Sequence, residues 1–367
     1  MRVGRPGLLL AAWLLAALLL ELVSHATWVA IENSGRLSNG IYAVKKLLDE
    51  PWEKQSLVSH PYMLYWNRPN FSAMGFRQTN SLGYRNAYEP AERKGLRVLA
   101  LGGSTTFAFP YVPDPERIWT ALLERDLRQA TPGRLVEVLN AGAPYATSAE
   151  LLAHYVFRGQ HLEPDLVIFH EGGNDVVPLM FGGYSPEYLH FRESSNLKPR
   201  PFEAAILKGL YSVRLVYAVW LARFPAIYIP QPTGFDQIPR DVATARVRAS
   251  DSAGFRRNLE TIIRLAGSRG TRVLMIGFLQ ARRERLTLGM PQYAGLEDAV
   301  IEGVAKHDRI MADLAVRYPG TAMFVALNQE RFKDEWFIDN CHLTEEGERE
   351  KARQIGAAVA RTLARPL

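Results

Sequence analysis

Residues 97–107 read Arg-Val-Leu-Ala-Leu-Gly-Gly-Ser-Thr-Thr-Phe, a short apolar run that ends in two glycines and three hydroxyl side chains. A run of this length that stops at glycine is typical of a buried strand followed by a tight turn. A serine that follows such a turn and opens a helix keeps its hydroxyl accessible. The stretch therefore predicts a strand, a turn and a helix, with Ser104 at the turn.

Further runs of this kind follow along the chain, and helical patterns lie between them. The predicted strands are 97–101, 135–139, 166–170, 272–276 and 322–326, and the predicted helices are 115–130, 148–161, 252–268, 296–317 and 344–364. Strands that alternate with helices predict a parallel sheet covered on both faces. Right-handed crossovers make this a doubly wound α/β sandwich.

Polar, glycine-rich segments follow four of these strands. They are 102–106, 140–142, 172–175 and, after a loop, 339–342. Ligands of such folds bind beyond the carboxyl ends of the strands, so we expect the four segments to meet at one edge of the sheet. His170 and Glu171 adjoin the third segment; they either line the pocket or are merely packed.

The residue types in these segments point to nucleophilic catalysis. Ser104 needs a base, and the imidazole of His342 can take its proton and return it. Asp339, three residues earlier, can accept a hydrogen bond from the imidazole and fix its tautomer. The backbone N–H groups of Ser104 and Gly142 and the side-chain amide of Asn174 are candidate donors to an oxyanion.

Taken in order, the four segments resemble the blocks of the SGNH (GDSL-like) hydrolases, and Asn80-Ser81-Leu82-Gly83-Tyr84-Arg85 with the Gly-Gly-Ser-Thr block resembles an exported bacterial branch of that superfamily. The resemblance spans roughly residues 80–364. It implies a three-layer α/β/α sandwich with a parallel five-stranded flavodoxin-like sheet, and hydrolysis or transfer of ester-linked acyl groups. It also implies the same site: Ser104, Asp339 and His342 as catalytic residues and Ser104, Gly142 and Asn174 as the oxyanion hole.

Two positions depart from the family pattern. Gly103 stands where the usual Gly-Asp-Ser block has aspartate, so a side-chain contact near the nucleophile is missing. Tyr145 stands where a glycine often follows the second block, which narrows the expected pocket.

The N-terminal 31 residues differ from the rest of the chain. Arg2 and Arg5 precede an unbroken apolar run from Leu8 to Leu20. Two alternatives stay open: a signal peptide cleaved after Ala26, or an uncleaved membrane anchor that continues to Ile31. Both predict export of the remainder. Residues 32–95 are expected to form a linker and an N-terminal extension, and residues 96–367 the hydrolase-type domain.

An insertion at about 180–250 interrupts the strand–helix alternation. Residues 191–250 hold nine Lys or Arg and four Asp or Glu, which favours a solvated face over a groove for an acidic glycan. Within it, Ala205 to Trp220 is apolar but contains Lys208 and Arg214. We expect an amphipathic helix that packs on the domain, or else lies on a membrane surface, rather than a membrane span.

Composition excludes several classes of protein. Hydrophobic residues make up 47% of the 367 residues and charged residues 22%, which is ordinary for a globular protein. The single cysteine, Cys341, rules out an internal disulfide and a cysteine-rich zinc site, and we expect a buried, inert thiol. The chain has no His-Glu-x-x-His sequence and no phosphate-binding loop, so we expect no metal, no cofactor and no nucleic-acid partner.

The sequence thus predicts an exported serine esterase or acyltransferase. An O-acetyl group of an envelope or secreted polysaccharide is the expected substrate. The alternative is a noncatalytic glycan-binding or scaffold protein of the cell envelope that keeps the hydrolase fold.

Overall fold

The computed structural model describes residues 5–34, 41, 44, 56–60, 62–92, 95–190, 201–223 and 238–364. Most of the expected linker, 35–55, and two stretches of the basic insertion, 191–200 and 224–237, lie outside the described residues. The chain divides into two compact units: Met1–Gln55 with Glu193–Ile229, and Ser56–Arg192 with Pro230–Leu367. The second unit is called the catalytic unit below, because it contains all four polar segments.

A parallel sheet forms the centre of the catalytic unit. Its strands are β5 (Leu96–Gly102), β6 (Val136–Gly142), β7 (Leu166–His170), β8 (Arg272–Ile276) and β9 (Ala322–Val325). Their order across the sheet is β6-β5-β7-β8-β9, and every neighbouring pair is parallel. This is the predicted doubly wound topology, and each predicted strand is confirmed with shifts of a few residues at its ends.

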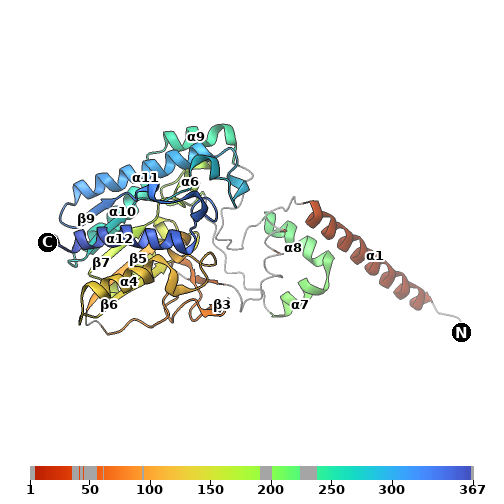
Figure 1. Cartoon of the computed structure of the whole chain (residues 1–367). Coiled ribbons are helices and arrows are strands. Elements are labelled where there is room, and N and C mark those ends of the chain that lie inside the picture. The colour runs from red at the N-terminus through yellow and green to blue at the C-terminus, as the bar shows by residue number, and fades with distance from the viewer. Residues whose placement is uncertain are drawn as a thin grey trace. The chain divides into compact units, whose positions relative to one another are not determined.

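Helices cover both faces of the sheet (Figure 1). On one face lie α4 (Trp119–Ala130) and α12 (Glu345–Ala364), which contact each other. On the other lie α5 (Ser148–Phe157), α10 (Ala253–Gly267) and α11 (Glu297–Arg317). All residues of β5 are buried, because a strand in the middle of a covered sheet meets apolar side chains on both sides. The predicted α/β/α layers are therefore confirmed.

Shorter elements connect these layers. They are the helices α3 (Ser104–Phe107), α6 (Val176–Met180) and α9 (Arg240–Ala249), and the 3₁₀ turns Pro115–Arg117, Gly159–Leu162, Arg283–Arg285, Pro291–Tyr293, Gln329–Arg331 and Asp334–Trp336. Two predicted helices end in such turns. The helix predicted at 115–130 is broken at Ile118, and the one predicted at 148–161 ends at Phe157 before a separate turn.

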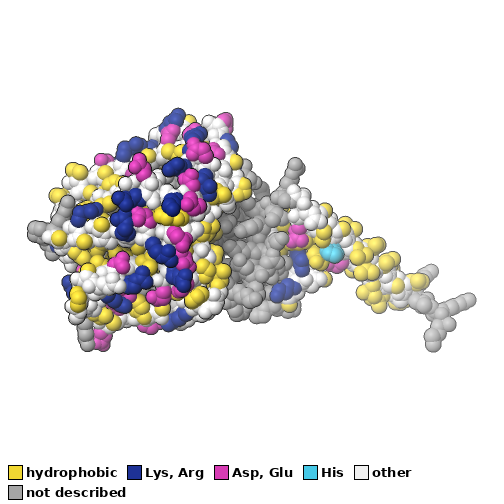
Figure 2. All heavy atoms as spheres, in the orientation of Figure 1, with side chains coloured by type: hydrophobic (Ala, Val, Ile, Leu, Met, Phe, Trp, Pro, Cys, Tyr) yellow, Lys and Arg dark blue, Asp and Glu magenta, His cyan; other side chains and the backbone are white. Residues whose placement is uncertain are grey.

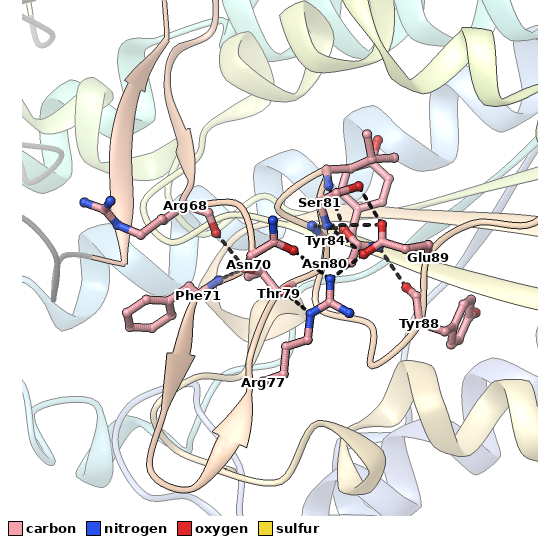
Figure 3. Close-up of polar contacts among 11 residues, drawn as sticks. Arg68, Asn70, Phe71, Arg77, Thr79, Asn80, Ser81, Tyr84, Tyr88 and Glu89 are labelled. Carbon is pink, nitrogen blue, oxygen red and sulfur yellow. Dashed lines mark hydrogen bonds and ion pairs between the residues drawn. The ribbon is translucent and has the colours of Figure 1, made fainter.

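Residues 56–92 form two small hairpins and a loop that belong to the catalytic unit. The first hairpin pairs β1 (Leu57–His60) with β2 (Leu64–Asn67), and the second pairs β3 (Ser72–Ala73) with β4 (Phe76–Arg77). In the loop that follows, Glu89 accepts hydrogen bonds from the N–H (3.1 Å) and the hydroxyl (2.6 Å) of Ser81 and pairs with Arg77 (Figure 3). The carboxylate therefore ties the second hairpin to the loop.

The same loop covers the open edge of the sheet. The backbone N–H of Arg85 donates to the carbonyl of Asn140 in β6, at 2.9 Å. The side chain of Asn86 donates to Val138 O and accepts from the N–H of Asn140, each at 2.9 Å. An edge strand otherwise presents unpaired backbone groups, so these bonds close β6. Gly83 is required in this loop, because its φ is +75° and a Cβ there would lie 2.5 Å from the carbonyl oxygen of Asn67.

The other unit contains three described helices: α1 (Arg5–Ser34), α7 (Pro201–Gly209) and α8 (Tyr211–Arg223). With 30 residues, α1 is about 45 Å long and ends three residues beyond Ile31, the last residue of the predicted uncleaved anchor. The single helix predicted for Ala205 to Trp220 is instead two helices that break at Leu210. Arg214 stabilises this break, because its guanidinium donates to the carbonyls of Leu207 and Lys208 at the end of α7.

Candidate active site

Ser104 begins helix α3 directly after the central strand β5. Close neighbours explain why glycine stands at position 102, two residues before the serine. A Cβ on Gly102 would lie 2.2 Å from the hydroxyl of Thr106 and 2.5 Å from the carbonyl of His170, so only glycine lets the chain turn here. Lys351, from α12, donates to the carbonyl of Thr105 at 2.8 Å and holds this short helix from the far side. The hydroxyl of Ser104 is thus presented at the carboxyl edge of the sheet.

Ser104, His342 and Asp339 form one hydrogen-bonded chain. The Nε2 atom of His342 lies 2.8 Å from Ser104 Oγ, and its Nδ1 atom lies 2.7 Å from Asp339 Oδ2. The other oxygen, Asp339 Oδ1, accepts the backbone N–H groups of Cys341 (2.9 Å) and His342 (2.8 Å). Residues 238 positions apart in the chain are therefore brought into contact, as the sequence predicts.

The protonation of this chain follows from Asp339. Burial by itself raises the pKa of Asp339, but the hydrogen bond and charge of His342 and the two backbone N–H groups outweigh burial and leave the pKa below its ordinary value. An ionised carboxylate only accepts, so Nδ1 of His342 carries the proton. Nε2 is then left to accept the proton of Ser104, which is the arrangement that a hydroxyl needs to become a nucleophile.

Tyr111 completes the surroundings of His342, and the sequence analysis missed it. The two rings stack with their centroids 3.7 Å apart and their planes at 11°. The loop that carries Tyr111 is held by the buried Arg85, which donates to the carbonyls of Phe107 (2.5 Å), Val112 and Pro113 (3.2 Å). The aromatic run Phe109-Pro110-Tyr111 after the first block was the available signal, but nothing in it shows which ring it would meet.

The predicted oxyanion donors lie at adjacent strand ends. Gly102 pairs with Gly142 across β5 and β6, and with His170 across β5 and β7, so the three segments that follow are neighbours. The N–H of Gly142, however, donates to Asn140 Oδ1 at 3.0 Å, and a Cβ on Gly142 would lie 2.5 Å from the nitrogen of Phe107. Glycine at 142 is therefore explained by packing against α3. The side-chain amide of Asn174 donates to the carbonyl of Ala146 at 2.9 Å.

Tyr145, which stands where the family often has glycine, has an unusual backbone conformation. Its φ is +63°, a left-handed conformation that glycine adopts without strain and other residues rarely do. The chain therefore keeps, with a tyrosine, the turn that a glycine would favour at this point of the second block.

The two strand-end residues next to the third block have different surroundings. The buried ring of His170 lies 3.0 Å from the hydroxyl of Thr106, beneath α3 rather than in a pocket. Burial keeps the pKa of His170 well below its ordinary value, so the ring is neutral. Glu171 is also fully buried, and burial followed by the charge of Asp175 raises its pKa to about 8.

The described residues contain one group of side chains that could hold a metal ion, and it overlaps this site. The ligand atoms of Asp339, Cys341 and His342 all lie within 4.8 Å of one another. Two of them, however, already form the 2.7 Å hydrogen bond described above. Cys341 is half-buried, where the sequence analysis expects a buried residue, but desolvation still raises the pKa of its thiol well above the ordinary value, so the thiol stays protonated and is a poor ligand and a poor nucleophile.

Comparisons with solved structures find distant likenesses of the fold. LAE5, an α/β hydrolase enzyme from the metagenome of Lake Arreo in Spain, is 14% identical, with a TM-score of 0.44 over 73% of this chain and 96% of its own. A GDSL-like lipase from Bacteroides thetaiotaomicron is 16% identical, with a TM-score of 0.40 over 75% and 93%. A catalytic mutant of Axe2, an acetylxylan esterase from Geobacillus stearothermophilus, is 14% identical, with a TM-score of 0.40 over 74% and 96%.

At this identity such likenesses say nothing about the substrate, and no curated protein matches the chain. The family comparison is decisive instead. Residues 100–350, well over half of the chain, match the model of one family, and the match includes all four polar segments. The chain belongs to the GDSL-like lipase/acylhydrolase family.

Proposed function

We propose that this protein is an exported, membrane-anchored serine esterase in which Ser104 attacks the carbonyl carbon of an acyl ester. The observation that carries the proposal is the hydrogen-bonded chain from Ser104 through His342 to Asp339, with distances of 2.8 and 2.7 Å. Membership of a family of lipases and acylhydrolases supports the same reaction class.

The reaction follows from the protonation of the three residues. As Ser104 Oγ forms a bond to the carbonyl carbon, Nε2 of His342 takes its proton, and ionised Asp339 stabilises the imidazolium. The imidazolium then protonates the leaving alcohol oxygen as the ester bond breaks, which leaves an acyl group on Ser104. A water molecule, or a sugar hydroxyl in the transferase version, then gives its proton to His342 as its oxygen bonds to the acyl carbonyl carbon. His342 returns the proton to Ser104 Oγ as the bond between Oγ and the acyl group breaks, which releases the acid or the new ester.

The tetrahedral intermediate carries a negative oxygen that needs donors. The proposed donors are the backbone N–H groups of Ser104 and Gly142 and the amide of Asn174. The N–H of Gly142 must first leave the side chain of Asn140, so its contribution depends on a shift of that side chain. The amide of Asn174 likewise has to exchange a partner, the carbonyl of Ala146 or Oε2 of Glu171, for the oxyanion. Loss of one such donor typically lowers turnover by about 10²–10³-fold.

The N-terminal helix supports anchoring in a membrane. Among the described residues, Pro6–Ser34 of α1 is the one helix long and apolar enough to cross a bilayer, a property that a signal sequence shares. Hydrophobic side chains are exposed along it (Figure 2). Arg2 and Arg5 precede the apolar run of this helix in the sequence, and positive residues stay on the cytoplasmic side, so the remainder of the chain would lie outside.

Contacts of α1 favour the anchor over the cleaved signal peptide. The carboxylate of Glu21 accepts the backbone N–H groups of Tyr211 (2.8 Å) and Ser212 (3.2 Å) at the start of α8. The ring of His25 lies 4.3 Å from that of Tyr211. Cleavage after Ala26 would remove Glu21 and His25 and leave the first turn of α8 without these partners.

The test of catalysis is labelling by a fluorophosphonate probe of the purified full-length chain. We expect labelling that is lost in Ser104→Ala and retained in Ser268→Ala, a matched variant of an exposed serine remote from the site. If Ser104→Ala is labelled as strongly as the parent protein, the proposed nucleophile is wrong. A complete absence of labelling and of ester hydrolysis favours the noncatalytic glycan-binding alternative.

The finer proposal is an O-acetyl group of an envelope or secreted polysaccharide as substrate. Its support is the exported orientation, because such polymers lie on that side of the membrane. Acetate release from a panel of acetylated glycans, set against fatty-acyl lipid esters of increasing chain length, tests it. Release of fatty acid from the lipid esters alone would show that the substrate is a lipid and not a polysaccharide.

A further inference from the structure

Gly103, the residue before the proposed nucleophile, is not needed for the backbone conformation. Its φ is −84°, outside the left-handed region that favours glycine. Glycine at this position must therefore be explained by the space around it. This is the position at which the usual Gly-Asp-Ser block has an aspartate side chain, so that the contact made by that side chain is missing here.

The carboxyl group of Glu171 fills this space. A Cβ on Gly103 would lie 2.3 Å from Glu171 Oε2 and 2.7 Å from the amide nitrogen of Asn174. Glu171 is 0% exposed, and its Oε1 atom accepts the backbone N–H groups of Gly172 (2.9 Å) and Asn174 (2.8 Å). These two bonds hold the carboxyl group through Oε1, so moving it aside to admit a substituent at residue 103 would break them.

The same carboxyl group contacts a proposed oxyanion donor twice. Oε1 fixes the backbone of Asn174, and Oε2 lies 3.4 Å from its side-chain nitrogen. Together with the carbonyl of Ala146, Glu171 therefore determines where the Asn174 amide points.

We propose that Glu171 is a positioning residue, which supplies from the end of β7 the contact missing at Gly103 and holds the Asn174 amide in place for the oxyanion. Gly103 and Glu171 then form a complementary pair, in which the absence of one side chain makes room for the other. The kinetic half of the proposal, that Glu171 affects turnover through Asn174, rests on the proposed esterase function. The steric half, that the Glu171 carboxyl group fills the space beside Gly103, rests on packing alone.

The kinetic half is tested by a double-mutant cycle on hydrolysis of p-nitrophenyl acetate by the full-length protein. Glu171→Ala is expected to lower kcat by about 10²-fold with KM little changed, close to the effect of losing a donor. In the Asn174→Ala background the same change is expected to cost less than about tenfold, because residues that act through one another are not additive. Glu171→Gln, which keeps the Oε1 acceptor, should recover part of kcat. Fully additive effects, or wild-type kcat in Glu171→Ala, would overturn the positioning role.

The steric half is tested by thermal unfolding, which does not depend on activity. Gly103→Ala is expected to lower Tm, and the loss should shrink when it is measured in the Glu171→Ala background. Gly320→Ala is the matched control, since a Cβ there meets nothing within 4 Å, and its Tm should be unchanged or raised. An unchanged Tm in Gly103→Ala would contradict the complementary pair. Activity that survives Ser104→Ala would instead contradict the proposed function and leave this steric result standing.

Discussion

At the scale of single residues, Asp339 has the role that is easiest to separate from folding. Asp339→Asn keeps the volume but leaves a side chain that can stabilise the wrong tautomer of His342, so kcat should fall by about 10³–10⁴-fold. Ester hydrolysis under saturating substrate is the measurement. The control is Asp313→Asn, an exposed aspartate whose partner is Arg256, and its kcat should match the parent protein. A fall of less than about tenfold in Asp339→Asn would show that this carboxylate does not assist His342.

Glu171 should also leave a signature in the pH dependence of stability. Its pKa is about 8 in the folded protein and near 4.5 in the unfolded chain, so the folded state binds more protons between these values. Stability therefore falls as pH rises through this window, by up to about 1.4 kcal/mol per pH unit for each proton. The groups that act on Glu171 or feel its charge are Asp175, Tyr293, Cys341 and Lys351.

The cleanest interval lies between pH 7.5 and 8.5, above the pKa of histidine in the unfolded chain. In that interval the buried histidines with lowered pKa values are neutral in the folded protein and almost fully neutral in the unfolded chain, where their pKa is about 6.5, and the carboxyl group of Asp175, with a pKa of about 6, no longer contributes much. Denaturant unfolding should show the free energy of unfolding falling with pH in the parent protein and falling less in Glu171→Gln. Identical slopes in the two proteins would mean that Glu171 is already ionised at pH 7.5.

Residue by residue, the sequence predicted the groups whose chemistry is local to a motif. Ser104, Asp339 and His342 sit at strand and loop ends that the alternation pattern places at one edge. Tyr111 and Lys351 could not be found in this way, because their contacts with His342 and Thr105 depend on how a loop and the last helix pack. Gly142 shows the opposite case. The motif predicts Gly142 as part of the oxyanion hole, but the structure explains the glycine by the close approach of α3, which leaves no room for a Cβ.

At the scale of elements, the sheet was predictable because parallel strands are short apolar runs with sharp ends. The loop between α3 and α4 was not, since its shape depends on Arg85, which comes from the N-terminal extension and donates to the last carbonyl of α3 and to two carbonyls of the loop. The extension thus helps to build the active site as well as covering the edge of β6.

This loop makes a prediction for Tyr111. Tyr111→Ala removes the ring that stacks on His342, and a stacked pair is worth about 0.5–1.5 kcal/mol, so kcat should fall by about 2–10-fold. Tyr111→Phe keeps the stacked ring, so most of the lost kcat should be recovered. Tyr62→Ala is the control, because Tyr62 stacks on Phe157 at the surface, away from the site. Equal kcat values in Tyr111→Ala and the parent protein would show that the stack does not hold the imidazole.

At the scale of the whole molecule, the grouping of segments was the least predictable feature. The sequence analysis treated the insertion at 180–250 as one part of the hydrolase-type domain. In the structure, α9 packs with α6 and α11 in the catalytic unit, whereas α7 and α8 group with α1. Glu21 and Arg214 explain the second grouping, since each satisfies backbone groups at a helix end. Pairings between segments about 190 positions apart leave no periodic trace in the sequence.

If α1 spans the bilayer, α8 should contact lipid, because Glu21 ties its first turn to the apolar helix. Val219 on α8 is 70% exposed, and Val316 on α11 of the catalytic unit is 82% exposed, which makes the two valines a matched pair. A nitroxide attached to a cysteine at each position of the full-length protein in vesicles should report opposite environments. At residue 219, oxygen should relax the spin label and a water-soluble nickel chelate should not; at residue 316 the chelate should be effective. The parent chain, with only Cys341, gives the background labelling. Equal access of the chelate to both positions would place α8 in water and restrict membrane contact to α1.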